Sequence, residues 1–209
     1  MIRHDLKCIF VHINKTGGSS IVKALNMLQV HMSASLLFSN EASLRADAQY
    51  DVWDGWLNGR RITHQNYEKL ENIKNYWDDY LTFTVVRNPY ERVVSDYFYC
   101  RKHNLIDLSI SFTEDVKSTF DNRERWKLPC YDWITLNNEI VVENIIRFEN
   151  LKQGFDDMCK TLGVPHIKLP HLNKTKHTHY TDYYDDETRE LVAKKYAKDI
   201  ETFGYEFGE

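Results

Sequence analysis

The feature that most constrains the fold is a glycine-rich segment near the N-terminus, which lies between an apolar run and a stretch of helical character. The apolar run is Cys8–Val11, the polar segment ends in Lys15–Ser20, and the helix-like stretch is Ile21–Leu28. A strand, a glycine-rich turn and a helix in this order present backbone N–H groups to a phosphate or a sulfate. Because Lys15 adds a full positive charge there, we predict a binding site for a phosphorylated or sulfated ligand.

The order of residues in this segment differs from the loops of nucleotide hydrolases. In the Walker A loop the lysine follows the glycines, whereas Lys15 precedes Gly17 and Gly18. The pattern G-x-G-x-x-G is absent as well. Phosphoryl transfer also requires acidic groups that hold magnesium, yet Arg87 follows the second buried strand, Leu81–Val86. A magnesium-dependent hydrolase is therefore disfavoured, and the alternative interpretation of the segment is a glycine turn with a solvated lysine.

A second segment combines a strand with the start of a well-capped helix. Leu81–Val86 is rich in β-forming residues, and Asn88 and Glu91 occupy the N-cap and capping-box positions of the helix that follows. Arg87 lies at the carboxyl end of the strand, where open α/β sheets bind ligands. Together with the hydroxyl of Ser95 it predicts a second anion site. For Arg87 alone, the other interpretation is a surface salt bridge.

These two segments resemble the anion-binding motifs of the sulfotransferases that use 3′-phosphoadenosine 5′-phosphosulfate (PAPS). Lys15–Ser20 resembles the 5′-phosphosulfate loop of that family, and Arg87–Ser95 resembles its 3′-phosphate motif. The chain is most similar to the carbohydrate branch, which includes the heparan 2-O-sulfotransferases and the chondroitin sulfotransferases. Further blocks follow in family order: Arg147–Leu151, Leu169–Thr175, Tyr196–Ile200 and Phe203–Tyr205. The family usually has proline at the position of Asn14 and often threonine at that of Ser19, but neither change removes a ligand group.

The resemblance implies roles for individual residues in binding the donor. The 5′-phosphosulfate would contact Lys15, Thr16, Gly17, Gly18, Ser19 and Ser20, the 3′-phosphate would contact Arg87 and Ser95, and a late loop with Lys174 and Thr175 would close over the nucleotide. Lys15 would also neutralise the leaving phosphate, so that adenosine 3′,5′-bisphosphate is the product. A sulfuryl group carries less charge than a phosphoryl group, and we therefore expect no metal.

The acceptor hydroxyl needs a general base, and histidine is the side chain that titrates near neutral pH. Among the nine histidines, His64 resembles the base of the family, although a hydrogen-bonded loop histidine is the alternative. His12 also fits the family pattern and is expected to support the end of the sheet. His171, His177 and His179 do not have the spacing of a standard structural zinc site.

Strands and helices alternate along the chain. The expected strands are 7–13, 81–86 and 143–148, and the expected helices are 19–29, 89–102, 151–162 and 186–200. This alternation predicts an α/β fold, a three-layer P-loop-like domain with a central parallel sheet flanked by helices. The 209 residues contain no repeat or linker and fit a single domain, 1–209. Residues 30–80 and 103–140 are less regular, carry all five tryptophans, and are expected to face the acceptor.

Composition restricts the partners and the compartment. A net charge of −4 gives no reason to expect nucleic acid or an anionic membrane as a partner, and no apolar run approaches the length of a membrane span. Met1–Lys7 lacks the apolar core of a signal peptide, so we expect a cytoplasmic protein whose four cysteines are free thiols. Asn14 heads a glycosylation sequon, and a glycan there would block the loop.

Three classes of function remain open at this point. A sulfotransferase acting on a carbohydrate hydroxyl comes first, because aromatic and arginine side chains of the less regular regions suit an acidic sugar. The acceptor could instead be a small natural product. A P-loop nucleotide kinase requires a magnesium-holding acid at a strand end, and a non-catalytic nucleotide-binding module has no use for both Lys15 and His64.

Overall fold

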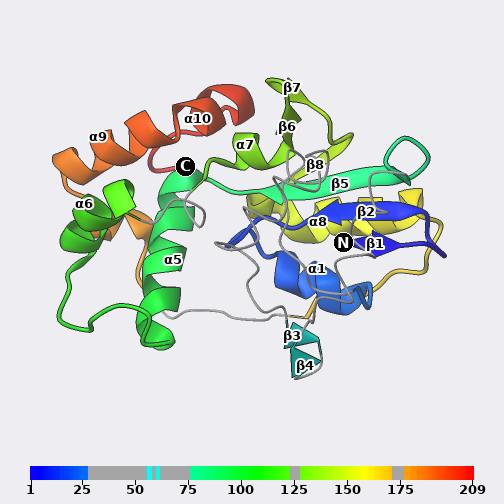
Figure 1. Ribbon diagram of the computed structural model, residues 1–209, viewed down its shortest axis with the longest axis horizontal. Helices are drawn as coiled ribbons and strands as arrows, with labels where there is room; N and C mark the ends of the chain where they lie inside the picture. Colours follow the sequence, from blue (N-terminus) through cyan, green and yellow to red (C-terminus); the bar gives the residue numbers. More distant parts are fainter. Residues whose placement is uncertain (28–55, 58–59, 62–75, 123–127, 171–176) are drawn as a thin grey trace. The chain divides into compact units, whose positions relative to one another are not determined.

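The computed structural model falls into two compact units, each built from two separated segments of the chain. The first unit comprises residues 1–86 and 132–172, and the second comprises 87–131 and 173–209. The structure describes residues 1–27, 56–57, 60–61, 76–122, 128–170 and 177–209 (Figure 1).

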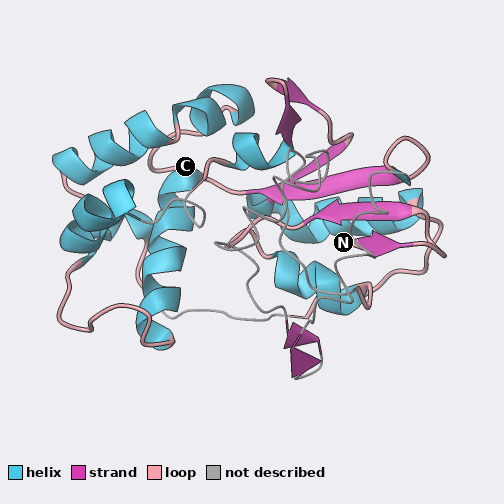
Figure 2. Ribbon diagram, in the orientation of Figure 1, coloured by secondary structure: helices cyan, strands magenta, loops and turns pink. Residues whose placement is uncertain are grey.

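Among the described residues, the first unit contains a four-stranded sheet in the order β1-β2-β5-β8 (Figure 2). Its strands are β1 (Ile2–Arg3), β2 (Cys8–Val11), β5 (Leu81–Val86) and β8 (Asn144–Arg147). The last three are parallel, with Phe10 opposite Phe83 and Val85 opposite Ile146, whereas β1 is antiparallel to β2. The sheet is thus parallel at its centre, as predicted, and is mixed because of the added edge strand. Two short hairpins pair β3 (Trp56–Leu57) with β4 (Arg60–Arg61) and β6 (Thr135–Leu136) with β7 (Glu139–Ile140).

Helices cover the sheet of the first unit. These are α1 (Gly18–Ala24), the 3₁₀ helix η3 (Phe148–Asn150) and α8 (Leu151–Thr161). Both α1 and α8 pack on one face of the sheet, where they share a hydrophobic core with Cys8, Phe10, Phe83, Val85 and Ile146. Alternate side chains on the opposite face, among them Ile9, Val11 and Val86, are buried too. Both faces of the sheet are therefore covered, which confirms the predicted α/β class with flanking helices.

The second unit is built from helices around an aromatic core. Its elements are α5 (Pro89–Lys102), α6 (Phe112–Asn122), η4 (Tyr180–Tyr183), α9 (Asp186–Lys195) and α10 (Ala197–Phe203), and α7 (Cys130–Ile134) lies where the chain returns to the first unit. The helices α5, α6 and α9 pack against one another. Their core contains Tyr90, Tyr97, Phe112, Tyr180, Val192 and Tyr196. The rings of Tyr90 and Phe207 meet edge to face, with centroids 5.0 Å apart, the geometry that aromatic pairs prefer.

The strands and helices lie close to the predicted ranges, with three corrections. The helix predicted over 19–29 is shorter, since α1 ends at Ala24 and Leu25 is its C-cap. The predicted helix 186–200 is interrupted at Tyr196, whose φ is −103°, and continues as α10 to Phe203. The region 103–140 was expected to be irregular but contains α6. A capping box begins this helix, since the Ser111 amide donates to the Glu114 carboxylate (2.8 Å) and the Glu114 amide donates to the Ser111 hydroxyl (3.3 Å).

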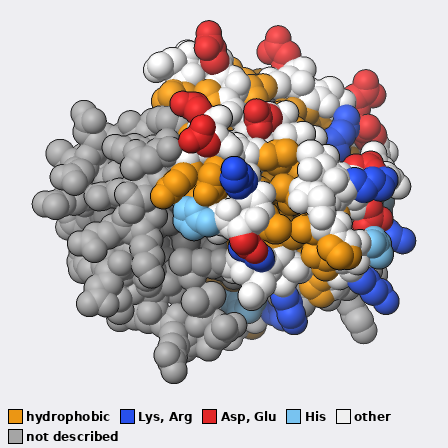
Figure 3. Space-filling model, turned by 90° about the vertical axis from the view of Figure 1, so that its right-hand side faces the viewer, with side chains coloured by type: hydrophobic (Ala, Val, Ile, Leu, Met, Phe, Trp, Pro, Cys, Tyr) orange, Lys and Arg blue, Asp and Glu red, His pale blue; other side chains and the backbone are white. Residues whose placement is uncertain are grey.

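One face of the described residues carries charges of both signs among hydrophobic side chains (Figure 3). In Figure 3, lysine and arginine side chains lie among aspartate and glutamate side chains over the visible described face. In the part of the chain that the structure describes, every helix is too short or too polar to cross a bilayer.

Candidate active site

The glycine-rich segment forms a tight loop between β2 and α1. Lys15 has a φ of 66° and Gly17 a φ of 82°, both in the left-handed region. The Thr16 hydroxyl is fully buried and donates to the carbonyl of Ile13 (2.9 Å), and the Ser20 amide donates to the carbonyl of Gly17 (3.0 Å). A positive φ at a residue other than glycine is uncommon and tends to occur at functional sites. The loop therefore has a defined shape, with Lys15 at its strained position.

Neither glycine of the loop has room for a side chain. A Cβ at Gly17 would lie 2.9 Å from both Cδ2 of Leu151 and Cε2 of Phe148. A Cβ at Gly18 would overlap the imidazole of His12, with Nε2 only 2.5 Å away. The two glycines thus lie against different neighbours, and the backbone of the loop remains bare of side chains between Thr16 and Ser19.

The base of the loop is anchored in the sheet. The Phe10 ring stacks on that of Phe83, with centroids 4.8 Å apart, and also on the ring of His12 at 5.6 Å. The Thr84 hydroxyl donates to the carbonyl of Val11 (2.7 Å), which links β5 to the end of β2. Because these groups are buried, the loop starts from a rigid support. That rigidity suits a site that must hold an anion in one geometry.

The predicted 3′-phosphate residues lie at the start of the second unit. Arg87 precedes α5 and is 7% exposed, as is Ser95 within that helix. The Arg87 guanidinium pairs with both carboxylate oxygens of Glu91, with Nη2–Oε1 at 2.8 Å and Nε–Oε2 at 3.2 Å. The low exposure of Arg87 distinguishes this pair from a surface salt bridge. An anion that binds Arg87 must therefore share it with Glu91 or displace the carboxylate.

The local sequence explains the start of α5. The side chain of Asn88 accepts from the Tyr90 amide (3.1 Å) and donates through Nδ2 to the carbonyl of Glu206 (2.9 Å). Pro89 occupies the first turn, as predicted for a residue without an amide proton. Glu91, the expected capping-box residue, directs its carboxylate to Arg87.

Three predicted site residues, His64, Lys174 and Thr175, lie outside the described residues. The same holds for His171. Of the other histidines in that cluster, His177 has Nδ1 2.7 Å from the Thr178 carbonyl oxygen, and His179 has Nδ1 2.8 Å from the Thr181 hydroxyl.

Sequence reasoning missed the residues that surround the loop. Phe148 and Leu151 contact Gly17, although the block that contains them was recognised only as a resemblance without a role. They come from η3 and the first residue of α8, directly after β8. The order of motifs along the chain could have indicated this contact, because β8 follows β5 in the sheet and its carboxyl end lies at the same edge as the loop.

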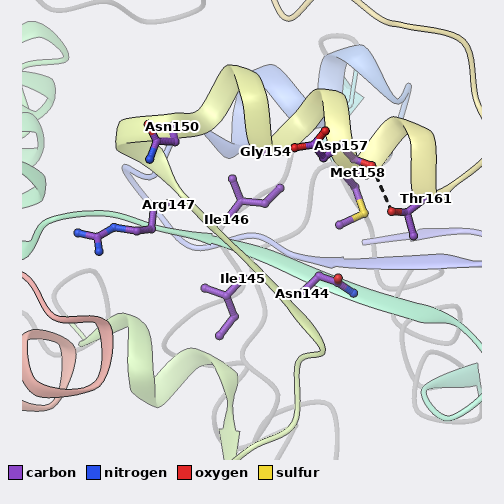
Figure 4. Close-up of a pocket in the computed structure, with 9 residues that line it drawn as sticks. All are labelled: Asn144, Ile145, Ile146, Arg147, Asn150, Gly154, Asp157, Met158 and Thr161. Atoms are coloured by element: carbon purple, nitrogen blue, oxygen red, sulfur yellow. Dashed lines mark hydrogen bonds between the residues drawn. The ribbon is translucent and has the colours of Figure 1, made fainter.

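An open hollow of about 310 Å³ lies between β8 and α8 (Figure 4). Its polar lining includes Asn144, Arg147, Asn150, Asp157 and Thr161. Figure 4 shows Ile146 pointing toward α8 and Ile145 pointing to the opposite side of β8. None of the predicted site residues lines the hollow.

An α/β sheet whose central strand leads into a glycine-rich loop and a helix is typical of the P-loop-like class of folds. Within this class, the model of the family described as "Sulfotransferase family" matches residues 1–206. The chain therefore belongs to the sulfotransferase family and is an enzyme of sulfuryl transfer.

Two further similarities accompany the family match. An uncharacterized protein of Archaeoglobus fulgidus is 33% identical over 92 residues, which are 44% of this chain and 75% of that protein. The crystal structure of a sulfotransferase from Alicyclobacillus acidocaldarius superposes with a TM-score of 0.53 at 16% identity, covering 96% of this chain and 94% of that one. At this identity the structural likeness concerns the fold, and it agrees with the α/β class described above.

Proposed function

We propose that this enzyme transfers a sulfuryl group from PAPS to a hydroxyl of a carbohydrate. The observation that carries the proposal is the loop Lys15–Ser20, which follows the central strand β2 and excludes side chains at both of its glycines. Sulfotransferases generally use PAPS, and this chain is a member of that family over residues 1–206.

The groups of the loop suit a phosphosulfate. Glycine at positions 17 and 18 lets the loop backbone pack tightly against Phe148, Leu151 and His12. The N–H groups of this tight turn are proposed to face the anion. Ser19 and Ser20 add hydroxyl donors, and Lys15 adds a cation beside them. In the proposed mechanism, Lys15 neutralises the charge that develops on the leaving phosphate, and the loop holds the group in line with the acceptor.

The 3′-phosphate is assigned to Arg87 and Ser95. Strands β2 and β5 are adjacent and parallel, so their carboxyl ends lie at the same edge of the sheet. The loop follows β2, and Arg87 directly follows Val86, the last residue of β5. Lys174 and Thr175 are proposed to complete the nucleotide site from the late loop of the family.

A thermal-shift panel tests the proposal directly. Adenosine 3′,5′-bisphosphate at 100 times its Kd is expected to stabilise the protein by about 2.7 kcal/mol, which corresponds to roughly 5–10 °C in Tm for a chain of this size. ADP is expected to give a smaller shift, and ATP with magnesium no larger a shift than ADP. A dominant response to ATP with magnesium would instead support the P-loop kinase alternative.

The variant Arg87→Ala tests the 3′-phosphate site by comparing nucleotides with and without that phosphate. It is expected to weaken binding of the bisphosphate by about 10–100-fold, because hydrogen bonds to a charged group contribute about 1.5–3 kcal/mol. Binding of adenosine 5′-monophosphate, which lacks the 3′-phosphate, is expected to stay unchanged. Equal losses for both nucleotides would contradict the assignment of Arg87 to the 3′-phosphate.

His64 is the proposed general base, and the proposal is supported by its resemblance to the base of the family. His64→Ala is expected to lower kcat by about 100-fold, within the usual range for loss of a general base. The bisphosphate product is expected to bind with its Kd unchanged. A loss of nucleotide binding in this variant would identify His64 as a structural histidine instead.

The compartment and the domain organisation remain part of the proposal. The four cysteines Cys8, Cys100, Cys130 and Cys159 are buried thiols that form no disulfide bond, which supports the cytoplasm as the compartment. Asn14 is 8% exposed, so a glycan at its sequon would not fit. A single domain of residues 1–209 is supported by the family match, which runs through both units without a break.

A further inference from the structure

His12 occupies a place that the proposed chemistry does not use. Its side chain is 3% exposed, and its ring lies nearly parallel to that of Phe10, with an interplanar angle of 18°. Phe10 in turn stacks on Phe83 in the adjacent strand, at an interplanar angle of 26°. The imidazole is therefore stacked on Phe10, which is itself stacked on Phe83 in the sheet core.

The opposite side of the imidazole faces Gly18, the first residue of α1. A Cβ built on Gly18 would lie 2.5 Å from Nε2 and 3.1 Å from Cγ of His12, although real Cβ contacts essentially never fall below 3.0 Å. Gly18 does not have a positive φ, in contrast to Gly17. The requirement for glycine at position 18 thus comes from the ring of His12 and not from the backbone conformation.

The glycine-rich loop also packs against side chains that follow β8. Phe148 and Leu151 contact Gly17, so consecutive glycines rest on neighbours from two different parts of the first unit. The backbone between these contacts carries the N–H groups that would face the phosphosulfate. Displacements of about 1 Å at such a site reduce rates by about 100-fold.

We infer that His12 is a positioning residue for the donor: its imidazole fixes Gly18, and through Gly18 the backbone N–H groups at the start of α1. The inference rests on the proposed function of the loop as the phosphosulfate site. His12 acts on the backbone of the loop and takes no part in the chemical step. Its loss therefore affects the donor and leaves the acceptor side unchanged.

The contact between His12 and Gly18 can be tested by compensation. Gly18→Ala is expected to weaken binding of adenosine 3′,5′-bisphosphate by about 100-fold, because the new methyl group pushes the loop off the ring. His12→Ala removes the ring and is expected to weaken binding by about tenfold. The double variant is expected to bind at least about tenfold more tightly than Gly18→Ala, because the space left by the imidazole accepts the methyl group.

Two more variants separate positioning from general stability. His12→Phe keeps a flat ring against Phe10 and is expected to restore the donor KM toward that of the wild type, whereas His12→Ala raises the donor KM with the acceptor KM unchanged. Gly163→Ala is the control for general destabilisation. Its positive φ of 66° makes the alanine strained, but the added Cβ would meet nothing within 4 Å. Its Kd for the bisphosphate is expected to equal that of the wild type.

The outcomes distinguish this inference from the proposed function. If the wild type binds the bisphosphate and the double variant is no better than Gly18→Ala, His12 does not position the loop. Equal rises of the donor and acceptor KM in His12→Ala would also overturn the inference, even if Gly18→Ala does not fold. If the wild type itself does not bind the bisphosphate, the proposed function is overturned instead.

Discussion

Replacing Lys15 by alanine is expected to lower kcat by about 1,000-fold, the upper end of the effect of removing one group that stabilises developing charge. In the proposed reaction, the leaving phosphate of the donor gains negative charge as its bond to sulfur breaks. Lys15 is the cation of the loop, and its backbone has a left-handed conformation with a φ of 66°. Without the ammonium group, the backbone N–H groups and hydroxyls alone must stabilise that charge.

The measurement is kcat at saturating donor, with the bisphosphate Kd measured in parallel. Lys23→Ala is the matched control, because Lys23 is an exposed lysine in the last turn of α1, and its loss is expected to leave kcat unchanged. Lys15→Gly gives a second check. Glycine relieves the positive φ, so this variant is expected to lose kcat as Lys15→Ala does without a loss of Tm. Near-normal turnover in either Lys15 variant would exclude the leaving-group role.

The elements that hold the site could be predicted where the signals are local. The apolar run before Lys15 and the glycines after it indicate a strand, a loop and a helix, and β2 and α1 follow that order. The helix that begins at Pro89 was predicted with the observed bounds, because the N-cap Asn88 and the proline mark its start. These patterns depend on neighbours along the chain, which a sequence shows directly.

The contacts that shape the loop could not be predicted in this way. Gly17 faces Phe148 and Leu151, which are distant in sequence, and the contact depends on how α8 packs against the sheet. Glu91 has two possible partners, the N-cap amide and the arginine before it, and the sequence favours the first while the structure shows the pair with Arg87. The break at Tyr196 likewise coincides with a ring buried in the core of the second unit, an environment that depends on tertiary packing.

The largest effect on stability is expected at Asp199, a buried residue of the second unit. Asp199 is fully buried, and its two carboxylate oxygens accept from the amides of Cys130 and Tyr131, each at 2.7 Å. Arg92, 3% exposed, donates to the carbonyl of Leu128 (2.7 Å). Burial lowers the pKa of Arg92, but the neighbouring thiol, phenol and carboxyl groups, Asp199 included, outweigh it and raise the pKa above its usual value. Arg92 is therefore a buried cation, and the carboxyl groups of Asp96 and Asp199 are among the neighbours that favour its charge.

Asp199→Ala is expected to lower the free energy of unfolding by about 2–6 kcal/mol, because leaving one buried hydrogen-bond donor unsatisfied costs about 1–3 kcal/mol and two donors lose their acceptor. Two amides at the start of α7 would lose their acceptor, and the charge of Arg92 would lose one of its neighbours. Urea denaturation measures the loss as a lower midpoint with an unchanged slope. Glu201→Ala, at an exposed position of the same helix α10, is the matched control and is expected to change stability by less than about 0.5 kcal/mol.

A second substitution shows whether the loss of stability in Asp199→Ala comes from the lost charge or from the lost hydrogen-bond acceptors. Asp199→Asn keeps one oxygen acceptor for the α7 amides but removes the negative charge, so its effect is expected to lie between those of the wild type and Asp199→Ala. Replacing Arg92 by methionine in the Asp199→Ala background removes the cation as well. If the charge of Arg92 causes the destabilisation, this double variant is expected to be more stable than Asp199→Ala alone, because no unpaired charge remains buried. Additive losses would show that the two side chains stabilise the second unit independently.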